Sequence, residues 1–157
     1  MRAKEHNYSI GLKWTGNLGK GTKKYTAYSR DHEIQAFGKP LILGSSDPSF
    51  RGNPQRYNPE DLFVSTLSSC HMLWYLHLCT VNKITVIAYE DSAKGVMLEA
   101  ENGSGRFKRV TLFPSVVIKE NDKIDLATKL HQQAHDYCFI ANSVNFEVAC
   151  EPTIMVA

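Results

Sequence analysis

The order of the predicted elements indicates an α+β fold. A first block of strands is followed by a long apolar helix, a second block of strands, a second helix and a last strand. Strands grouped in blocks, rather than in strict alternation with helices, are typical of α+β domains. With 157 residues, of which 43% are hydrophobic, the chain is expected to form one domain over residues 1–157.

The first block predicts a hairpin followed by a long loop. Residues 9–14 form the first strand, a glycine-rich turn follows, and residues 25–34 alternate like its partner. Residues 38–57 are rich in Gly, Pro, Ser and Asn, with a short apolar run at 41–43. Loops of this length inside compact domains are often functional.

The stretch NPEDLFVSTLSSCHMLWYLHLC, residues 58–79, predicts one long helix. Asn58 is a favoured N-cap, and Pro59 suits the first helical position. At about 100° per residue its apolar side chains spread around nearly all sides, which is typical of a buried helix. One small sheet and one other helix do not cover every side. We therefore expect a homodimer in which the central helices pack together.

The second half of the chain predicts three strands, a helix and a last strand. The strands occupy residues 84–89, 96–101 and 107–118, and Asn102-Gly103-Ser104-Gly105 forms a hairpin turn. Asp125 opens the second helix, which ends near Cys138. The last strand spans residues 145–150.

Charge and hydropathy argue against two classes of partner. A net charge of +2 without a clustered basic face argues against nucleic acid. No apolar run reaches the roughly 18 residues that span a bilayer, and the start MRAKEHNYSI lacks the apolar core of a signal peptide. We expect a cytoplasmic protein without a membrane partner, whose four cysteines are thiols.

Two cysteines are candidate reactive groups. Cys70 lies near the middle of the long helix, and a charged His71 beside it would favour the thiolate. Cys138 lies at a helix end before a turn, which suits a thiol that moves to form a disulfide. The alternative is an inert, buried Cys70, because free cysteine is among the most buried residue types. Cys79 lies on the opposite helix face, and Cys150 is interpreted as a core residue.

A reactive Cys70 also needs a positive neighbour. A guanidinium lowers a thiol pKa and binds a peroxide oxygen, and the candidates upstream of the helix are Arg30, Arg51 and Arg56. Glu60 lies about 15 Å from Cys70 on a straight helix. Glu60 therefore reaches the same site only if the helix bends or begins later, or if it comes from a partner subunit.

Metal and cofactor motifs are weak. His131 and His135 are spaced as a ligand pair, but we favour a solvated helix face for them. Four side chains of the first helix point in different directions and close no tetrahedral site: Cys70, His71, His77 and Cys79. The sequence contains no P-loop, GxGxxG or GxSxG motif. We expect no metal and no cofactor, with a zinc-binding protein as an alternative.

Four motifs together resemble the OsmC/Ohr family of osmotically induced and organic hydroperoxide resistance proteins. They are YNPEDL at 57–62, SSCH at 68–71, AHDYC at 134–138 and SV at 143–144. The spacing of ten residues between Glu60 and Cys70 is the most specific element. The chain departs from the family at Phe139, where a proline often follows the second cysteine.

The resemblance implies an OsmC-like α+β fold, with antiparallel sheets packed around a central buried helix in an intertwined homodimer. It implies that Cys70 is the peroxidatic cysteine, that Cys138 is the resolving cysteine and that Glu60 pairs with an arginine. Arg51 is similar in placement to the arginine of OsmC proteins, and Arg30 to that of Ohr proteins.

The implied activity is a thiol-dependent peroxidase that reduces organic hydroperoxides and is restored by an external dithiol. Three side chains are expected to line an apolar mouth that favours organic substrates over hydrogen peroxide: Phe63, Trp74 and Phe139. The alternative is a binding or stress-response protein that keeps the dimeric fold without turnover, since a fold alone does not specify chemistry.

Overall fold

The computed structural model describes residues 4–157, so the first three residues of the stretch MRAKEHNYSI lie outside the described part. The chain divides into two compact units, of which the first ends at Leu62 and the second spans Phe63–Ala157. The predicted strands and helices occur in the predicted order, which confirms the α+β class, and two strands, Ile42–Gly44 and Thr153–Val156, were not predicted. No helix in the described part is long and apolar enough to cross a membrane.

The first unit contains a three-stranded antiparallel sheet. Its strands follow chain order: β1 (Gly11–Trp14), β2 (His32–Gln35) and β3 (Ile42–Gly44). The second strand is shorter than predicted, because residues 25–31 form turns and loop. Arg30 Nη1 binds the carbonyl oxygens of Tyr25 and Tyr28 at 3.1 and 2.9 Å, so these groups face a side chain rather than a strand.

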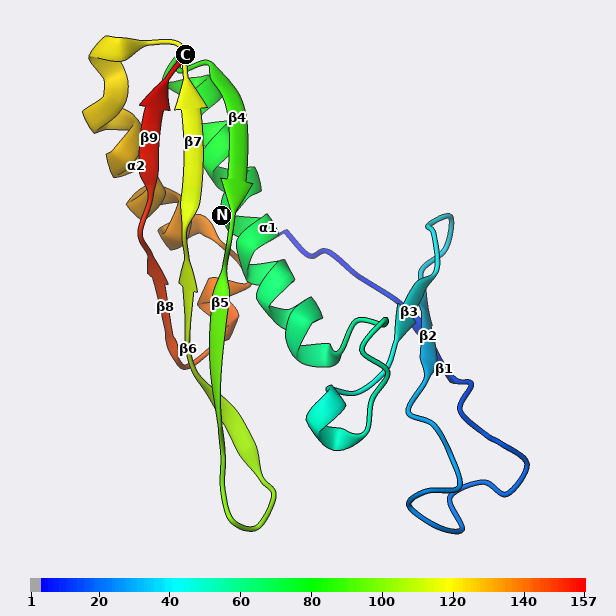
Figure 1. Cartoon of the computed structure of the whole chain (residues 1–157). Helices are drawn as coiled ribbons and strands as arrows, with labels where there is room; N and C mark the ends of the chain where they lie inside the picture. Colours follow the sequence, from blue (N-terminus) through cyan, green and yellow to red (C-terminus); the bar gives the residue numbers. More distant parts are fainter. Residues whose placement is uncertain (1–3) are drawn as a thin grey trace. The chain divides into compact units, whose positions relative to one another are not determined.

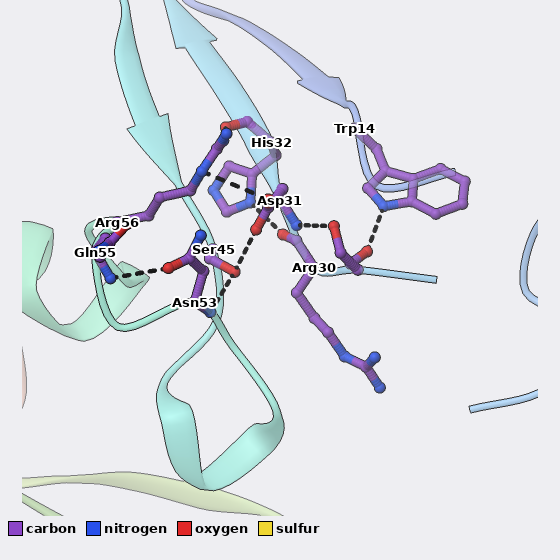
Figure 2. A network of polar contacts seen from close by, with 9 residues as sticks. Trp14, Arg30, Asp31, His32, Ser45, Asn53, Gln55 and Arg56 are labelled. Atoms are coloured by element: carbon purple, nitrogen blue, oxygen red, sulfur yellow. Dashed lines mark hydrogen bonds and ion pairs between the residues drawn. The ribbon is translucent and has the colours of Figure 1, made fainter. Parts of the chain in front are cut away.

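A network of polar contacts orders the loop before the long helix (Figure 2). Asp31 accepts a hydrogen bond of 3.0 Å from the Ser45 hydroxyl, and its other oxygen lies 3.5 Å from Arg56 Nε. Ser45 in turn accepts the backbone N–H of Asn53. Because Ser45 is fully buried, its two hydrogen bonds are shielded from water and hold the loop in one conformation. The loop also contains the 3₁₀ helix η1 (Pro48–Phe50).

The helix α1 (Pro59–Val81) begins where the sequence predicts. Asn58 Oδ1 accepts the N–H of Asp61 at 2.7 Å, and Asp61 Oδ2 accepts the N–H of Asn58 at 3.3 Å. This reciprocal pair satisfies two backbone donors that have no partner inside the helix. It confirms Asn58 as the N-cap.

The second unit contains two three-stranded sheets. One has the order β4 (Val86–Asp91), β7 (Pro114–Ile118) and β9 (Thr153–Val156); the other has β5 (Lys94–Glu99), β6 (Gly105–Leu112) and β8 (Glu147–Cys150). β4 continues into β5, β6 into β7, and β8 into β9 (Figure 1). The single strand predicted at 107–118 is therefore two strands, broken where Asp91 Oδ1 accepts the N–H of Phe113.

Each of these sheets also contains a parallel pair that was not predicted. β8 pairs with β6, and β9 with β7, in parallel register, whereas β4–β7 and β5–β6 are antiparallel. The cause is the connection through α2 (Ile124–Tyr137), because a helix between two strands returns the chain in the same direction. The 3₁₀ helices η2 (Asn121–Lys123) and η3 (Ala141–Ser143) flank α2.

The predicted hairpin turn between β5 and β6 is confirmed. Gly103 has φ of 80°, a left-handed conformation that glycine adopts without steric cost. The N–H of Ala100 bonds to the carbonyl of Ser104 at 2.7 Å and closes the turn.

The helices pack against the sheets of the second unit. α1 buries one stripe of side chains there: Leu67, His71, Tyr75, Leu78 and Cys79. α2 buries Ala127, Leu130, His131 and Ala134. Leu73, on the other side of α1, is 63% exposed. Within one chain, α1 is therefore buried along a stripe rather than on all sides.

Candidate active site

The two cysteines proposed as reactive groups lie side by side. Cys70 is in the middle of α1 and is half-buried, whereas Cys138 follows the last residue of α2 and is 1% exposed. The thiol of Cys138 hydrogen bonds with the Cys70 sulfur. A small molecule from solvent therefore meets Cys70 first, with Cys138 directly behind it.

The backbone of Cys138 lies outside the regular helix. Its φ and ψ of −69° and 107° are extended, and its N–H bonds to the carbonyl of His135. Its sulfur accepts the N–H of Ala141 at 3.4 Å. Because no helical dihedral is needed at this position, the Cys138 side chain can move toward Cys70 without unwinding α2. The predicted end of the helix near Cys138 is confirmed.

Burial also determines the protonation state of Cys138. Burial, together with the hydrogen bond to Cys70, raises the pKa of Cys138 to about 11. Cys138 therefore keeps its proton at neutral pH and donates it toward the Cys70 sulfur.

His71 does not supply the positive charge that the sequence analysis assigned to it. Its Nε2 lies 2.9 Å from Nδ1 of His131, inside the core. Burial lowers the pKa of His71 to about 4, so the imidazole is neutral at pH 7. The prediction that His71 acts as a charged neighbour of Cys70 is therefore wrong.

An apolar surface continues along α1 from Cys70. Trp74 lies one helical turn further on, and it stacks on Tyr137 with ring centroids 5.1 Å apart. Trp74 also meets Phe139 edge to face at 5.7 Å. Leu73, Trp74 and His77 line a shallow hollow of about 260 Å³. Two of the three predicted mouth residues, Trp74 and Phe139, are thus in contact.

The third predicted mouth residue, Phe63, lies in a different cluster. Its ring centroid is 5.0 Å from that of Phe107 and 5.9 Å from that of Phe146. These rings pack around the second core, which is formed by Leu67, Val110 and Leu112.

The candidate arginines belong to the unit that ends at Leu62, and each has a different environment. The Arg30 guanidinium lies 4.4 and 4.3 Å from the ring centroids of Tyr25 and Tyr28. It points away from the Asp31 network (Figure 2), and its Nη2 is buried without a hydrogen-bond partner among the described residues. Arg51 is exposed and adopts the left-handed φ of 66°. Arg56 is paired with Asp31.

Glu60 is half-buried in the first turn of α1, within the same unit as these arginines. The cysteine pair belongs to the unit Phe63–Ala157. The roles of Glu60, Arg30 and Arg51 at the cysteine pair therefore stay predictions.

One group of polar residues was missed by the sequence analysis. His131 is 3% exposed and stacks on Tyr75 at 3.8 Å, so its predicted place on a solvated face is wrong. The available signal was the apolar spacing of Ala127, Leu130 and Ala134, which places position 131 on the buried face of α2. Cys150, interpreted as plain core, lies beside His131 and His71.

Comparisons with known proteins agree with this architecture. The model of the OsmC-like protein family matches residues 52–153. An OsmC-like protein of unknown function from Vibrio cholerae is 33% identical over 95% of this chain and 100% of that chain, with a TM-score of 0.82. A comparison with curated proteins found no match.

Two more distant structures share the fold. An organic hydroperoxide resistance protein from Elizabethkingia anophelis has 20% identity and a TM-score of 0.66, covering 98% of this chain and 100% of that chain. Another, from Bacillus subtilis, has 18% identity and a TM-score of 0.61, covering 93% of this chain and 98% of that chain.

Proposed function

Because the chain belongs to the OsmC-like family, we propose that it is a cysteine-based peroxidase that reduces organic hydroperoxides. The observation that carries this proposal is the contact between a half-buried Cys70 and a buried, protonated Cys138. An accessible sulfur backed by a second thiol is the arrangement that a two-cysteine redox cycle requires.

In the first step the Cys70 thiolate attacks the terminal oxygen of the hydroperoxide. A sulfur–oxygen bond forms while the O–O bond breaks, so the sulfur is oxidised to a sulfenic acid and the peroxide is reduced. The leaving alkoxide takes a proton from solvent and departs as an alcohol.

In the second step the sulfur of Cys138 attacks the Cys70 sulfur. A disulfide forms, and the sulfenic hydroxyl leaves as water with the proton that Cys138 carried. The extended backbone of Cys138 outside α2 allows this approach. An external dithiol then reduces the disulfide by exchange, and we expect it to be available in the cytoplasm.

The apolar surface beside Cys70 supports an organic substrate. Trp74 and Phe139 contact each other, and Phe139 is 66% exposed, so an alkyl or aryl group gains apolar contact there. Hydrogen peroxide gains nothing from this surface. The proposed cycle uses thiols alone and no cofactor.

We further propose a homodimer that completes the site. Leu73, one helical turn from Cys70, is 63% exposed, and a partner subunit would cover this apolar side of α1. Glu60 and one arginine would then activate Cys70. Arg30 and Arg51 are the better candidates, because Arg56 is already paired with Asp31.

The test is mass spectrometry with peptide mapping of reduced protein after one equivalent of cumene hydroperoxide. We expect a Cys70–Cys138 disulfide within seconds, lost in Cys70→Ser. Cys79→Ser is the matched control, because Cys79 is a buried cysteine of the same helix. If every thiol survives while the hydroperoxide remains, the peroxidase proposal fails and the chain is a binding protein with an inert Cys70.

Arg30→Gln and Arg51→Gln, measured in parallel, assign the activating arginine. The variant that slows disulfide formation identifies the residue that acts on Cys70. If neither substitution slows it, the proposed role of these two arginines is excluded.

A further inference from the structure

Three metal-binding side chains converge inside the second unit. They come from three different elements: His71 from α1, His131 from α2 and Cys150 from the end of β8. His71 Nε2 lies 2.9 Å from His131 Nδ1, and Cys150 Sγ lies 3.6 and 3.8 Å from these two nitrogens. Two imidazole nitrogens and one sulfur, which belong to residues on separate elements, thus lie close together.

These separations are close to those around a tetrahedral ion. With bonds of about 2.0–2.1 Å to nitrogen and about 2.3 Å to sulfur, ligand atoms of zinc lie about 3.4 Å apart for a nitrogen pair and about 3.6 Å apart for nitrogen and sulfur. The two sulfur–nitrogen distances already fit this geometry. The two imidazoles would have to separate by about 0.5 Å.

The proton count around the cluster also favours a cation. A neutral imidazole has one donor and one acceptor nitrogen, so the hydrogen bond between His71 and His131 uses one proton and one lone pair. Among these three groups, the Cys150 thiol then has only the same lone pair to donate to. His131 Nε2 is buried without a partner among the described residues, so it offers no alternative. A single cation accepts all three lone pairs at once.

The charges near the cluster are compatible with metal binding. Burial lowers the pKa of His71 to about 4 and that of His131 to about 3, so both are neutral ligands at pH 7. Burial raises the pKa of Cys150 to about 12, and a bound dication would displace its proton. Asp91, which acts electrostatically on His71 and Cys150, is held by Ser68 and the N–H of Phe113. Its carboxylate adds negative charge beside the cluster.

We propose that His71, His131 and Cys150 form a binding site for one zinc-class divalent ion, separate from the cysteine pair. The site has three protein ligands and leaves the fourth position for water or another small ligand. Binding links α1, α2 and β8 at the centre of the second unit. This inference departs from the expectation of no metal, and it does not depend on peroxidase activity.

The first test is titration of the reduced, metal-free full chain with Co²⁺. We expect a cobalt–thiolate charge-transfer absorption that saturates at one equivalent. Cys150→Ser should abolish the band, whereas Cys79→Ser, which removes a buried cysteine outside the cluster, should bind like the parent. His131→Gln should weaken binding at least about 100-fold, because loss of an outer-shell partner alone costs about 10–100-fold. Circular dichroism verifies that each variant is folded.

A second measurement needs no variant. X-ray absorption at the zinc edge of the zinc-loaded protein should show one sulfur and two imidazole nitrogens. Cobalt binding should persist in Cys70→Ser, which separates this proposal from the peroxidase proposal. The metal site is excluded if the parent shows no cobalt–thiolate band. It is also excluded if the band survives Cys150→Ser but disappears in Cys70→Ser.

Discussion

The cysteine pair and the buried cluster use neighbouring residues of α1 in opposite environments. Cys70 is half-buried and contacts Cys138, whereas His71, the next residue, is 1% exposed and contacts His131 and Cys150. Successive residues of a helix point about 100° apart, so one face of α1 meets solvent while the next meets the core. Burial and backbone, rather than residue type, thus distinguish the sulfur proposed as a nucleophile, Cys70, from the sulfur proposed as a metal ligand, Cys150.

Cys138 of the cysteine pair and Cys150 of the buried cluster also differ in the freedom of their backbones. Cys138 lies beyond the end of α2 in an extended conformation, next to a short 3₁₀ helix. Cys150 lies in β8, paired in register with Leu112 of β6. A disulfide needs one sulfur to move, and a metal site needs its ligands to be held. Each backbone suits the role proposed for its cysteine.

The largest expected effect is the loss of turnover when the cysteine pair is broken. Cys138→Ser should consume about one equivalent of hydroperoxide and then stop, because the sulfenic acid at Cys70 has no resolving thiol. The measurement is hydroperoxide consumption with trapping of the sulfenic acid. Continued turnover at the parent rate without Cys138 would contradict the assigned role.

The next largest effect is a loss of stability when a leucine on the buried side of α1 is shortened. Leu67→Ala should lower the free energy of unfolding by about 2–5 kcal/mol, because it leaves a cavity in the second core. Leu73→Ala is the matched control, since Leu73 is 63% exposed in the single chain and should cost less than about 0.5 kcal/mol there. Urea unfolding measures both. A cost for Leu73→Ala that rises with protein concentration would support the proposed dimer.

The pH dependence of stability should report the buried histidines of the metal-free protein. His71 has a pKa of about 4 when folded and about 6.5 when unfolded, so protons bind preferentially to the unfolded chain. Stability is then complete above about pH 6.5 and falls as the pH drops toward 4, by about 3 kcal/mol for His71 alone. Urea midpoints at several pH values check this.

Replacement of the buried imidazole supplies the control for that experiment. His71→Gln should remove the share of the pH dependence that His71 contributes, because the titrating group is lost. A flat profile between pH 4 and 7 in the parent would contradict the burial of a neutral His71.

The smallest effect should come from the apolar surface beside Cys70. Phe139→Ala should lower kcat/KM for cumene hydroperoxide about tenfold, because an apolar contact with the substrate is lost. The kcat/KM for hydrogen peroxide should stay unchanged, since we expect no contact between that small substrate and Phe139. Steady-state rates with both peroxides measure the ratio, and an equal loss for both would place Phe139 outside the substrate surface.

Local features of the fold and site were predictable from the sequence. The cap formed by Asn58, the start of α1, the turn at Gly103 and the end of α2 near Cys138 all depend on residues close together in the chain. Local backbone hydrogen bonding and dihedral preferences produce these features, so a short stretch of sequence is enough to identify them. The motifs that pointed to Cys70 and Cys138 are local in the same sense.

Contacts between distant segments were decided only by the tertiary structure. The parallel pairing of β8 with β6 and of β9 with β7, and the contacts of His71 with His131 and Cys150, each join segments that are far apart in the chain. No residue in these segments signals its partner, because the direction of a strand and the place of a side chain depend on the connection that precedes them. The sequence by itself thus determined both helices, most of the strands and the candidate sulfurs, whereas packing decided which of them meet.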